Sequence, residues 1–124
     1  MIDYGHGEMR TGSTLQAVRA HAKVDPFAAP GAADLTAHVD FATLARIVQA
    51  RGARHLGTVT QGEWLRALGI DARAQALSAR APHYAQEIEA ARHRLVDEAQ
   101  MGRLFKVMGI AAPAWPDGAG FDAH

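Results

Sequence analysis

The chain has 124 residues, which is enough for one small domain and too few for two. Lys and Arg total 13 and Asp and Glu total 13, so the formal net charge is +0, and nothing suggests a basic nucleic-acid surface. The absence of Cys excludes disulfides and thiolate chemistry, and no apolar run approaches the roughly 18 residues of a membrane span.

The first residues are typical of the end of a buried strand. Met1 and Ile2 are followed by Asp3-Tyr4-Gly5-His6, which carries three polar side chains, those of Asp3, Tyr4 and His6. In open parallel sheets, ligands bind just beyond the carboxyl ends of the strands. These three side chains could therefore line a site, or Asp3 could only cap a turn while Tyr4 packs. Residues 7–33 show little periodicity and predict a long loop with one short helix near residues 14–22.

The stretch from Asp34 to Phe41 runs into the best helix pattern in the chain. Apolar residues recur at helical spacing from Phe41 onward and predict a helix over 41–51. Asp40 is placed to cap its start and Gly52 to follow its end. The polar side chains before the helix could be catalytic, or could fix the loop to the helix start. They are Asp34, Thr36, His38 and Asp40.

The second half of the chain reads as a strand, a series of helices and a final strand. Thr60 and Glu63 have capping-box spacing, which predicts a helix that ends at Gly69. In chain order, the other predicted elements are a strand over 54–60, a helix capped by Asp71 that ends near Pro82, a helix over 83–101 and a strand over 104–110. We expect residues 113–124 to be a frayed tail.

Seven His residues could suggest a metal site, but their spacing argues against one. No pair shows the His-x3-His or His-Glu-x-x-His pattern of helical ligands. We therefore expect no metal ligands. The residues are His6, His21, His38, His55, His83, His93 and His124.

Three segments together carry a family resemblance. They are Ile2-Asp-Tyr-Gly-His6, Asp34-Leu-Thr-Ala-His-Val-Asp-Phe41, and Thr60-Gln61 followed by Trp64-Leu65. The sequence resembles the C-terminal part of MidA-type S-adenosylmethionine-dependent methyltransferases. That family includes the mitochondrial complex I assembly methyltransferase, which modifies protein arginine. The resemblance covers nearly the whole chain, in order.

The resemblance implies an α/β fold of the Rossmann-like class I methyltransferase type. Residues 1–124 would supply only the C-terminal half of a single domain, with few strands flanked by about four helices. By analogy, residues 1–4 end the fifth strand, 54–60 form the sixth, and 104–110 form the seventh, antiparallel between the other two. The glycine-rich cofactor loop and the ribose-binding acid of the family lie upstream, so no cofactor-binding residue is expected here.

The implied function is that of the C-terminal portion of a methyltransferase acting on a protein side chain, namely arginine. S-adenosylmethionine would be bound by the parent protein, and the isolated chain would be inactive. The alternative is a small non-catalytic α+β interaction or assembly-factor module. We also expect a bacterial cytoplasmic location, and self-association through an exposed sheet edge.

The candidate site residues fall into two groups. Asp3, Tyr4, His6, His38 and Asp40 are expected at the rim of the site. Asp34 and Thr36 are expected to contact the substrate.

Overall fold

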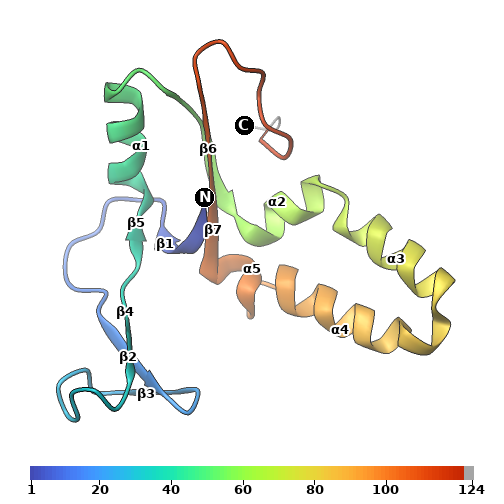
Figure 1. The fold of residues 1–124 in the computed structure, drawn as a ribbon, viewed down its shortest axis with the longest axis horizontal. Helices are drawn as coiled ribbons and strands as arrows, with labels where there is room; N and C mark the ends of the chain where they lie inside the picture. The colour runs from blue at the N-terminus through green and yellow to red at the C-terminus, as the bar shows by residue number, and fades with distance from the viewer. Residues whose placement is uncertain (122–124) are drawn as a thin grey trace.

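A computed structural model describes residues 1–121 and centres on a four-stranded sheet (Figure 1). Its strands lie in the order β5-β1-β7-β6. Their bounds are β1 Ile2–His6, β5 Val39–Asp40, β6 Arg54–Thr60 and β7 Phe105–Ala111. β7 is antiparallel to both β1 and β6, while the short β5 runs parallel to β1. The predicted place of the last strand, between the first strand and the strand over 54–60, is confirmed.

Helix α1, Phe41–Ala50, forms where the sequence predicts it. Both carboxylate oxygens of Asp40 accept hydrogen bonds from Thr43, one from its backbone N–H at 2.9 Å and one from its hydroxyl at 2.7 Å. Gly52 follows the helix with a φ of 79°, a conformation that glycine adopts without strain. The caps and the apolar face therefore set this helix locally.

The prediction of a long loop over residues 7–33 is wrong. The chain instead forms β2 Gln16–Arg19 and β3 Ala22–Val24, which join β4 Asp34–Thr36 in a three-stranded antiparallel sheet. The two residues that connect β2 to β3 both have positive φ, as the type I′ turn of a two-residue hairpin requires. The predicted helix near 14–22 is also wrong, because pairing with β4, about 20 residues away, outweighs weak local preference.

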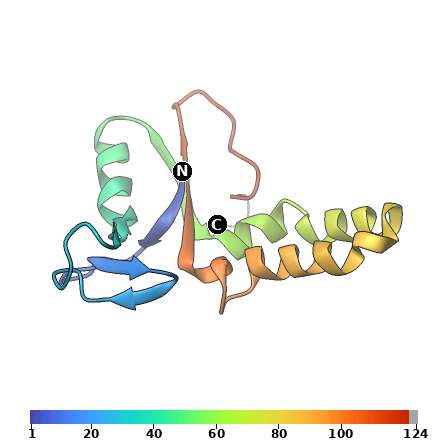
Figure 2. The same ribbon diagram turned by 60° about the horizontal axis from the view of Figure 1, so that its bottom comes forward.

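Four further helices fill the region from 61 to 104. They are α2 Gln61–Ala67, α3 Ile70–Arg80, α4 Ala85–Val96 and α5 Met101–Leu104, with a 3-10 turn η1 at Pro82–Tyr84. The capping box of Thr60 and Glu63 is confirmed. Helices α3 and α4 form an antiparallel hairpin that projects away from the sheet (Figures 1 and 2). This hairpin turns the chain back toward α5 and β7.

Two details of the predicted helices are wrong. Asp71 does not cap α3, because the N-cap position is held by Gly69 and Asp71 lies inside the first turn, where it pairs with Arg92 at 2.9 Å. The helix predicted over 83–101 is interrupted, since α4 ends at Val96 and Asp97 has extended backbone with ψ of 137°. This break sends the chain back toward the sheet.

Residues 113–121 are not frayed. Phe121 is 9% exposed and packs with Val59 and Val107 in the core. Trp64 supports this segment by donating its indole N–H to the carbonyl of Ala119 at 3.2 Å. Apolar burial of Phe121 therefore holds the segment against the sheet, and the rest of the predicted tail, 122–124, lies outside the described residues.

No helix within residues 1–121 is long and apolar enough to cross a membrane.

Candidate functional site

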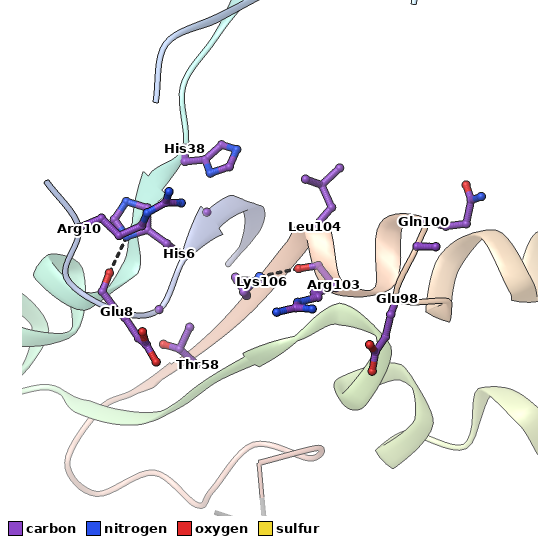
Figure 3. A pocket seen from close by; sticks show the side chains of 13 residues that line it. His6, Glu8, Arg10, His38, Thr58, Glu98, Gln100, Arg103, Leu104 and Lys106 are labelled. Carbon is purple, nitrogen blue, oxygen red and sulfur yellow. Dashed lines mark hydrogen bonds between the residues drawn. The ribbon is translucent and has the colours of Figure 1, made fainter. Parts of the chain in front are cut away.

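An open hollow of about 910 Å³ lies where β1 and β6 end and β7 begins (Figure 3). These ends meet because β7 is antiparallel to both neighbours, which brings Phe105 opposite Tyr4 and Lys106 opposite Thr60. Its lining comes from five separate parts of the chain. The residues are Gly5, His6, Gly7, Glu8, Arg10, His38, Thr58, Glu98, Ala99, Gln100, Arg103, Leu104 and Lys106.

The segment after β1 supplies one wall of the hollow. The Nδ1 atom of His6 donates a hydrogen bond to the backbone carbonyl of Glu8 at 2.7 Å. This bond fixes the turn that carries Glu8 and Arg10 past the end of the strand. In Figure 3 these three side chains lie on the same side of the hollow, with the Glu8 carboxylate near Thr58.

His38 enters the hollow from the segment between β4 and β5. Its backbone N–H donates to the Thr14 hydroxyl at 3.0 Å, and the Gln16 side-chain amide nitrogen lies 3.2 Å from its Nε2 atom. With the amide as donor, Nε2 accepts and the proton sits on Nδ1. That Nδ1 atom is buried and has no hydrogen-bond partner in the described chain. Burial lowers the pKa of His38, and the nearby charges of Arg10 and other cations lower it further.

The opposite wall comes from the connection after α4, from α5 and from the start of β7. Lys106 donates from its ammonium group to the carbonyl of Arg103 at 2.5 Å. Partial burial lowers the pKa of Lys106, and the Arg103 guanidinium lowers it further, while Glu63 acts in the opposite direction. Glu98 adds a carboxylate to this wall.

Two of the predicted rim residues, His6 and His38, line the hollow together. Asp3 and Tyr4 do not line it. Asp3 accepts a hydrogen bond from the Tyr4 backbone N–H at 2.8 Å, and the Tyr4 ring stacks on Phe105 with centroids 4.2 Å apart. Their roles in a site stay predictions, and the contacts seen here are structural.

The other three predicted residues also lie outside the hollow lining. Asp34 and Thr36 are exposed on β4, at one edge of the three-stranded sheet. Asp40 caps α1, and the hydrogen bonds from Thr43 lower the pKa of its carboxyl group. The hollow therefore does not include the predicted substrate-contacting pair.

Most of the charged lining was not predicted from sequence. Glu8 and Arg10 follow β1 closely, and the same rule that selected His6 could have selected them. Lys106 could have been found from strand register, since an antiparallel last strand begins beside the ends of its neighbours. No sequence pattern marked Glu98 as a site residue, because it reaches the hollow only when the α3–α4 hairpin folds back toward the sheet.

The Gly5-His6-Gly7 segment of the hollow does not form the glycine-rich loop of an S-adenosylmethionine site. A Gly-x-Gly sequence does occur, at Gly5-His6-Gly7, but a Cβ atom on Gly5 would lie 2.6 Å from Cδ2 of Phe41. The space at Gly5 thus serves packing of Phe41, and no helix begins after Gly7 to receive a cofactor. Among residues 1–121 there is also no group of three or more His, Asp or Glu arranged for a metal ion.

Comparisons with known proteins identify the class. Residues 1–59 match the family model described as "Putative S-adenosyl-L-methionine-dependent methyltransferase". The chain is 39% identical over 112 residues to the mitochondrial protein arginine methyltransferase NDUFAF7 homolog of Drosophila melanogaster, and 34% identical to human NDUFAF7. Each alignment covers 89% of this chain and 25% of the relative.

The fold also matches solved structures. A Burkholderia thailandensis methyl transferase candidate bound to S-adenosyl-homocysteine superposes with a TM-score of 0.82 at 30% identity, covering 98% of this chain and 33% of that one. A second structure from the same organism gives a TM-score of 0.81 at 31% identity, with 97% and 33% covered. These matches define a partial methyltransferase α/β fold. In sequence and in fold, the chain is similar to S-adenosylmethionine-dependent methyltransferases, as the sequence resemblance implies.

Two facts qualify what the relatives imply. The chain spans about a quarter of the length of the curated relatives it matches. The expectation of a bacterial cytoplasmic location is wrong by the same comparison, because those curated relatives are mitochondrial proteins of animals, although bacterial solved structures match as well.

Proposed function

We propose that this chain forms the acceptor side of an S-adenosylmethionine-dependent methyltransferase whose substrate is a protein arginine. The family supports methyl transfer, and the names of the curated relatives support arginine as the acceptor. The hollow at the strand ends supports a binding role for this part of the fold, because that is where α/β proteins bind ligands.

The observation that carries the proposal is a pair of carboxylates on the hollow. Glu8 comes from the segment after β1 and Glu98 from the connection after α4. Within the described residues, neither side chain forms an ion pair; those pairs involve Asp71, Glu89, Asp97 and Asp117. A carboxylate binds a guanidinium through charge-assisted, often paired, hydrogen bonds. These two groups are therefore available to orient the acceptor.

The chemistry divides between the cofactor and this chain. When bound, S-adenosylmethionine supplies an activated methyl group, and in the transfer an S–C bond breaks, an N–C bond forms and the acceptor nitrogen loses one proton. The role of this chain is to bind and orient the acceptor nitrogen, since positioning supplies much of the rate in such reactions. His6 and His38 lie close enough to the hollow to contribute to that binding.

The test uses a full-length homologue that has both glutamates at matching positions. Glu8→Gln and Glu98→Gln should each lower methyl transfer to a protein or peptide arginine while the melting temperature stays unchanged. Glu87→Gln is the matched control, because this exposed residue lies on α4 away from the hollow. If both glutamine variants keep full activity, these carboxylates do not hold the acceptor and the proposed site is wrong.

We further propose that the chain self-associates with a second copy through the edge of β1. Residues Ile2 to Tyr4 pair with β7 on one side, whereas β5 reaches only Gly5 and His6 on the other. Ile2 is 48% exposed and Tyr4 is 37% exposed. Unpaired backbone groups beside exposed apolar side chains favour pairing with another strand.

A further inference from the structure

Three permanently or mainly cationic side chains line the same hollow as the two glutamates. Arg10 comes from the segment after β1, Arg103 from α5 and Lys106 from the start of β7. The ion pairs formed within residues 1–121 lie elsewhere, on Arg54, Arg92 and His93. Segments almost 100 residues apart thus bring like charges to one place.

Neighbouring groups respond to this positive charge. The pKa of Lys106 is lowered by burial and then by Arg103, and the pKa of His38 is lowered by burial and then by Arg10, His6 and Lys106. Glu63 offsets part of the effect at Lys106. A like charge nearby disfavours the charged form of a group, so these shifts agree with a positive region that a bound anion would relieve.

The charges of the hollow are mixed, and this decides which anion fits. In Figure 3 the carboxylates of Glu8 and Glu98 lie on opposite walls of the hollow, with Lys106 and Arg103 between them and Arg10 close to His6. A polyanion such as nucleic acid would meet both glutamates, and the net charge of the chain gives it no general attraction. A peptide that carries one positive and one negative side chain matches both kinds of charge in the hollow.

We propose that Arg10, Arg103 and Lys106 bind the carboxylate of an acidic residue that neighbours the methyl-acceptor arginine in the protein substrate. This inference rests on the proposed function, in which Glu8 and Glu98 hold the acceptor itself. The cationic group would then select acceptor arginines by sequence context, because a neutral neighbour leaves the cations without a partner.

The test measures binding of short fluorescent peptides to the 124-residue chain by anisotropy. One peptide contains Arg with Glu two residues away, a second replaces that Glu with Gln, and a third keeps Glu and replaces Arg with Gln. We expect the second peptide to bind about fivefold more weakly than the first, the upper range for an exposed ion pair. High salt should reduce that difference.

A double-mutant cycle assigns the effect to the cationic group. Arg103→Gln and Arg10→Gln should each reduce the difference between the first two peptides, whereas Arg73→Gln on α3, outside the hollow, should leave it unchanged. Melting curves show whether each variant is folded, and the two separate variants keep the test valid if one fails to fold. Equal affinity for the first two peptides, or no binding of either, overturns the inference.

The third peptide separates this inference from the proposed function. If replacing Arg has no effect but replacing Glu does, acceptor recognition fails and the acidic-neighbour site stands. If replacing Arg weakens binding but replacing Glu does not, the proposed function stands and the inference is wrong.

Discussion

Gly5 and Phe41 fit together only because Gly5 has no side chain. A Cβ atom on Gly5 would lie 2.6 Å from Cδ2 of Phe41 and 2.5 Å from the carbonyl oxygen of Val39. Phe41 is the first residue of α1 and is fully buried. The contact therefore packs the end of β1 against the start of α1. It also positions the end of β1, which forms one wall of the hollow.

Gly5→Ala should destabilise the fold by about 1–3 kcal/mol, because overpacking forces the neighbouring groups to move. Gly7→Ala is the matched control, since its nearest contact would be Cγ2 of Thr58 at 3.9 Å, which is ordinary packing distance. Urea denaturation of both variants measures the two free energies of unfolding. If Gly5→Ala and Gly7→Ala lowered the free energy of unfolding by similar amounts, the packing argument would be wrong.

The α1 cap gives a second prediction, with a defined pH dependence. Hydrogen bonds from Thr43 lower the pKa of Asp40 below its value of 3.8, so its folded-state pKa lies below its unfolded-state pKa. Its contribution to stability is then present above pH about 3.8 and is lost as pH falls through the folded-state pKa.

Asp40→Asn should keep much of the cap at neutral pH, because asparagine also caps helices well, whereas Asp40→Ala should lower the melting temperature. Between pH 5 and 2, the wild-type protein should lose more stability than Asp40→Asn. In a full-length homologue, Asp40→Asn should also keep methyl-transfer activity. If Asp40→Asn instead lost most of its activity without losing stability, Asp40 would have a role in the site beyond capping α1.

The features predicted correctly from sequence are those that neighbouring residues decide. The start of α1 depends on Asp40 and Thr43, three residues apart, and the start of α2 depends on Thr60 and Glu63. By contrast, β2 forms through pairing with β4, and Phe121 is held by residues of β6 and β7. These contacts join distant segments, and single-residue preferences carry little information about them.

The residues of the candidate site likewise fall into those that local sequence predicted and those that only distant contacts bring to the hollow. His6 was predicted because it lies at the C-terminal end of the first strand, and His38 because it lies just before a helix in a segment that carries the family resemblance. Glu98, Arg103 and Lys106 reach the hollow only after the α3–α4 hairpin folds back and β7 pairs with β1. Asp3 and Asp34 looked equally suitable in sequence, but strand geometry places them outside the lining.

The lowered pKa of His38 predicts how stability responds to mild acid. The unfolded-state pKa is about 6.5 and the folded-state pKa is lower, so unfolding takes up a proton between the two values. The free energy of unfolding should therefore fall as pH falls through about 6.5. Once pH is below both pKa values, the full loss has occurred.

His38→Asn should remove part of this dependence, since asparagine does not titrate. Thermal melts at pH 7.5 and 5.0 measure the effect, with His83→Asn as the control, because His83 is exposed at η1 and away from the hollow. Gln16→Ala should shift the dependence without abolishing it, because it removes only the hydrogen bond to Nε2. An unchanged pH profile for His38→Asn would show that His38 does not carry the effect.

The open edge of β1 gives the last prediction. On the β7 side, β1 is firmly held, since Met1 and Met108 exchange backbone hydrogen bonds of 2.8 and 2.9 Å in addition to the pairing of Ile2 to Tyr4. On the other side, an antiparallel β1–β1 pair would be self-complementary, as a twofold dimer requires. The chain should therefore show concentration-dependent dimerisation.

Sedimentation equilibrium measures the dimerisation constant, and hydrogen exchange should show slower exchange at Ile2 to Tyr4 as concentration rises. Ile2→Lys should weaken the dimer, because a charged side chain at a sheet edge opposes pairing. Ile47→Lys is the matched control, since Ile47 is similarly exposed, at 50%, but lies on α1. A monomer at all concentrations, or equal weakening by the two substitutions, would show that the β1 edge is not the interface.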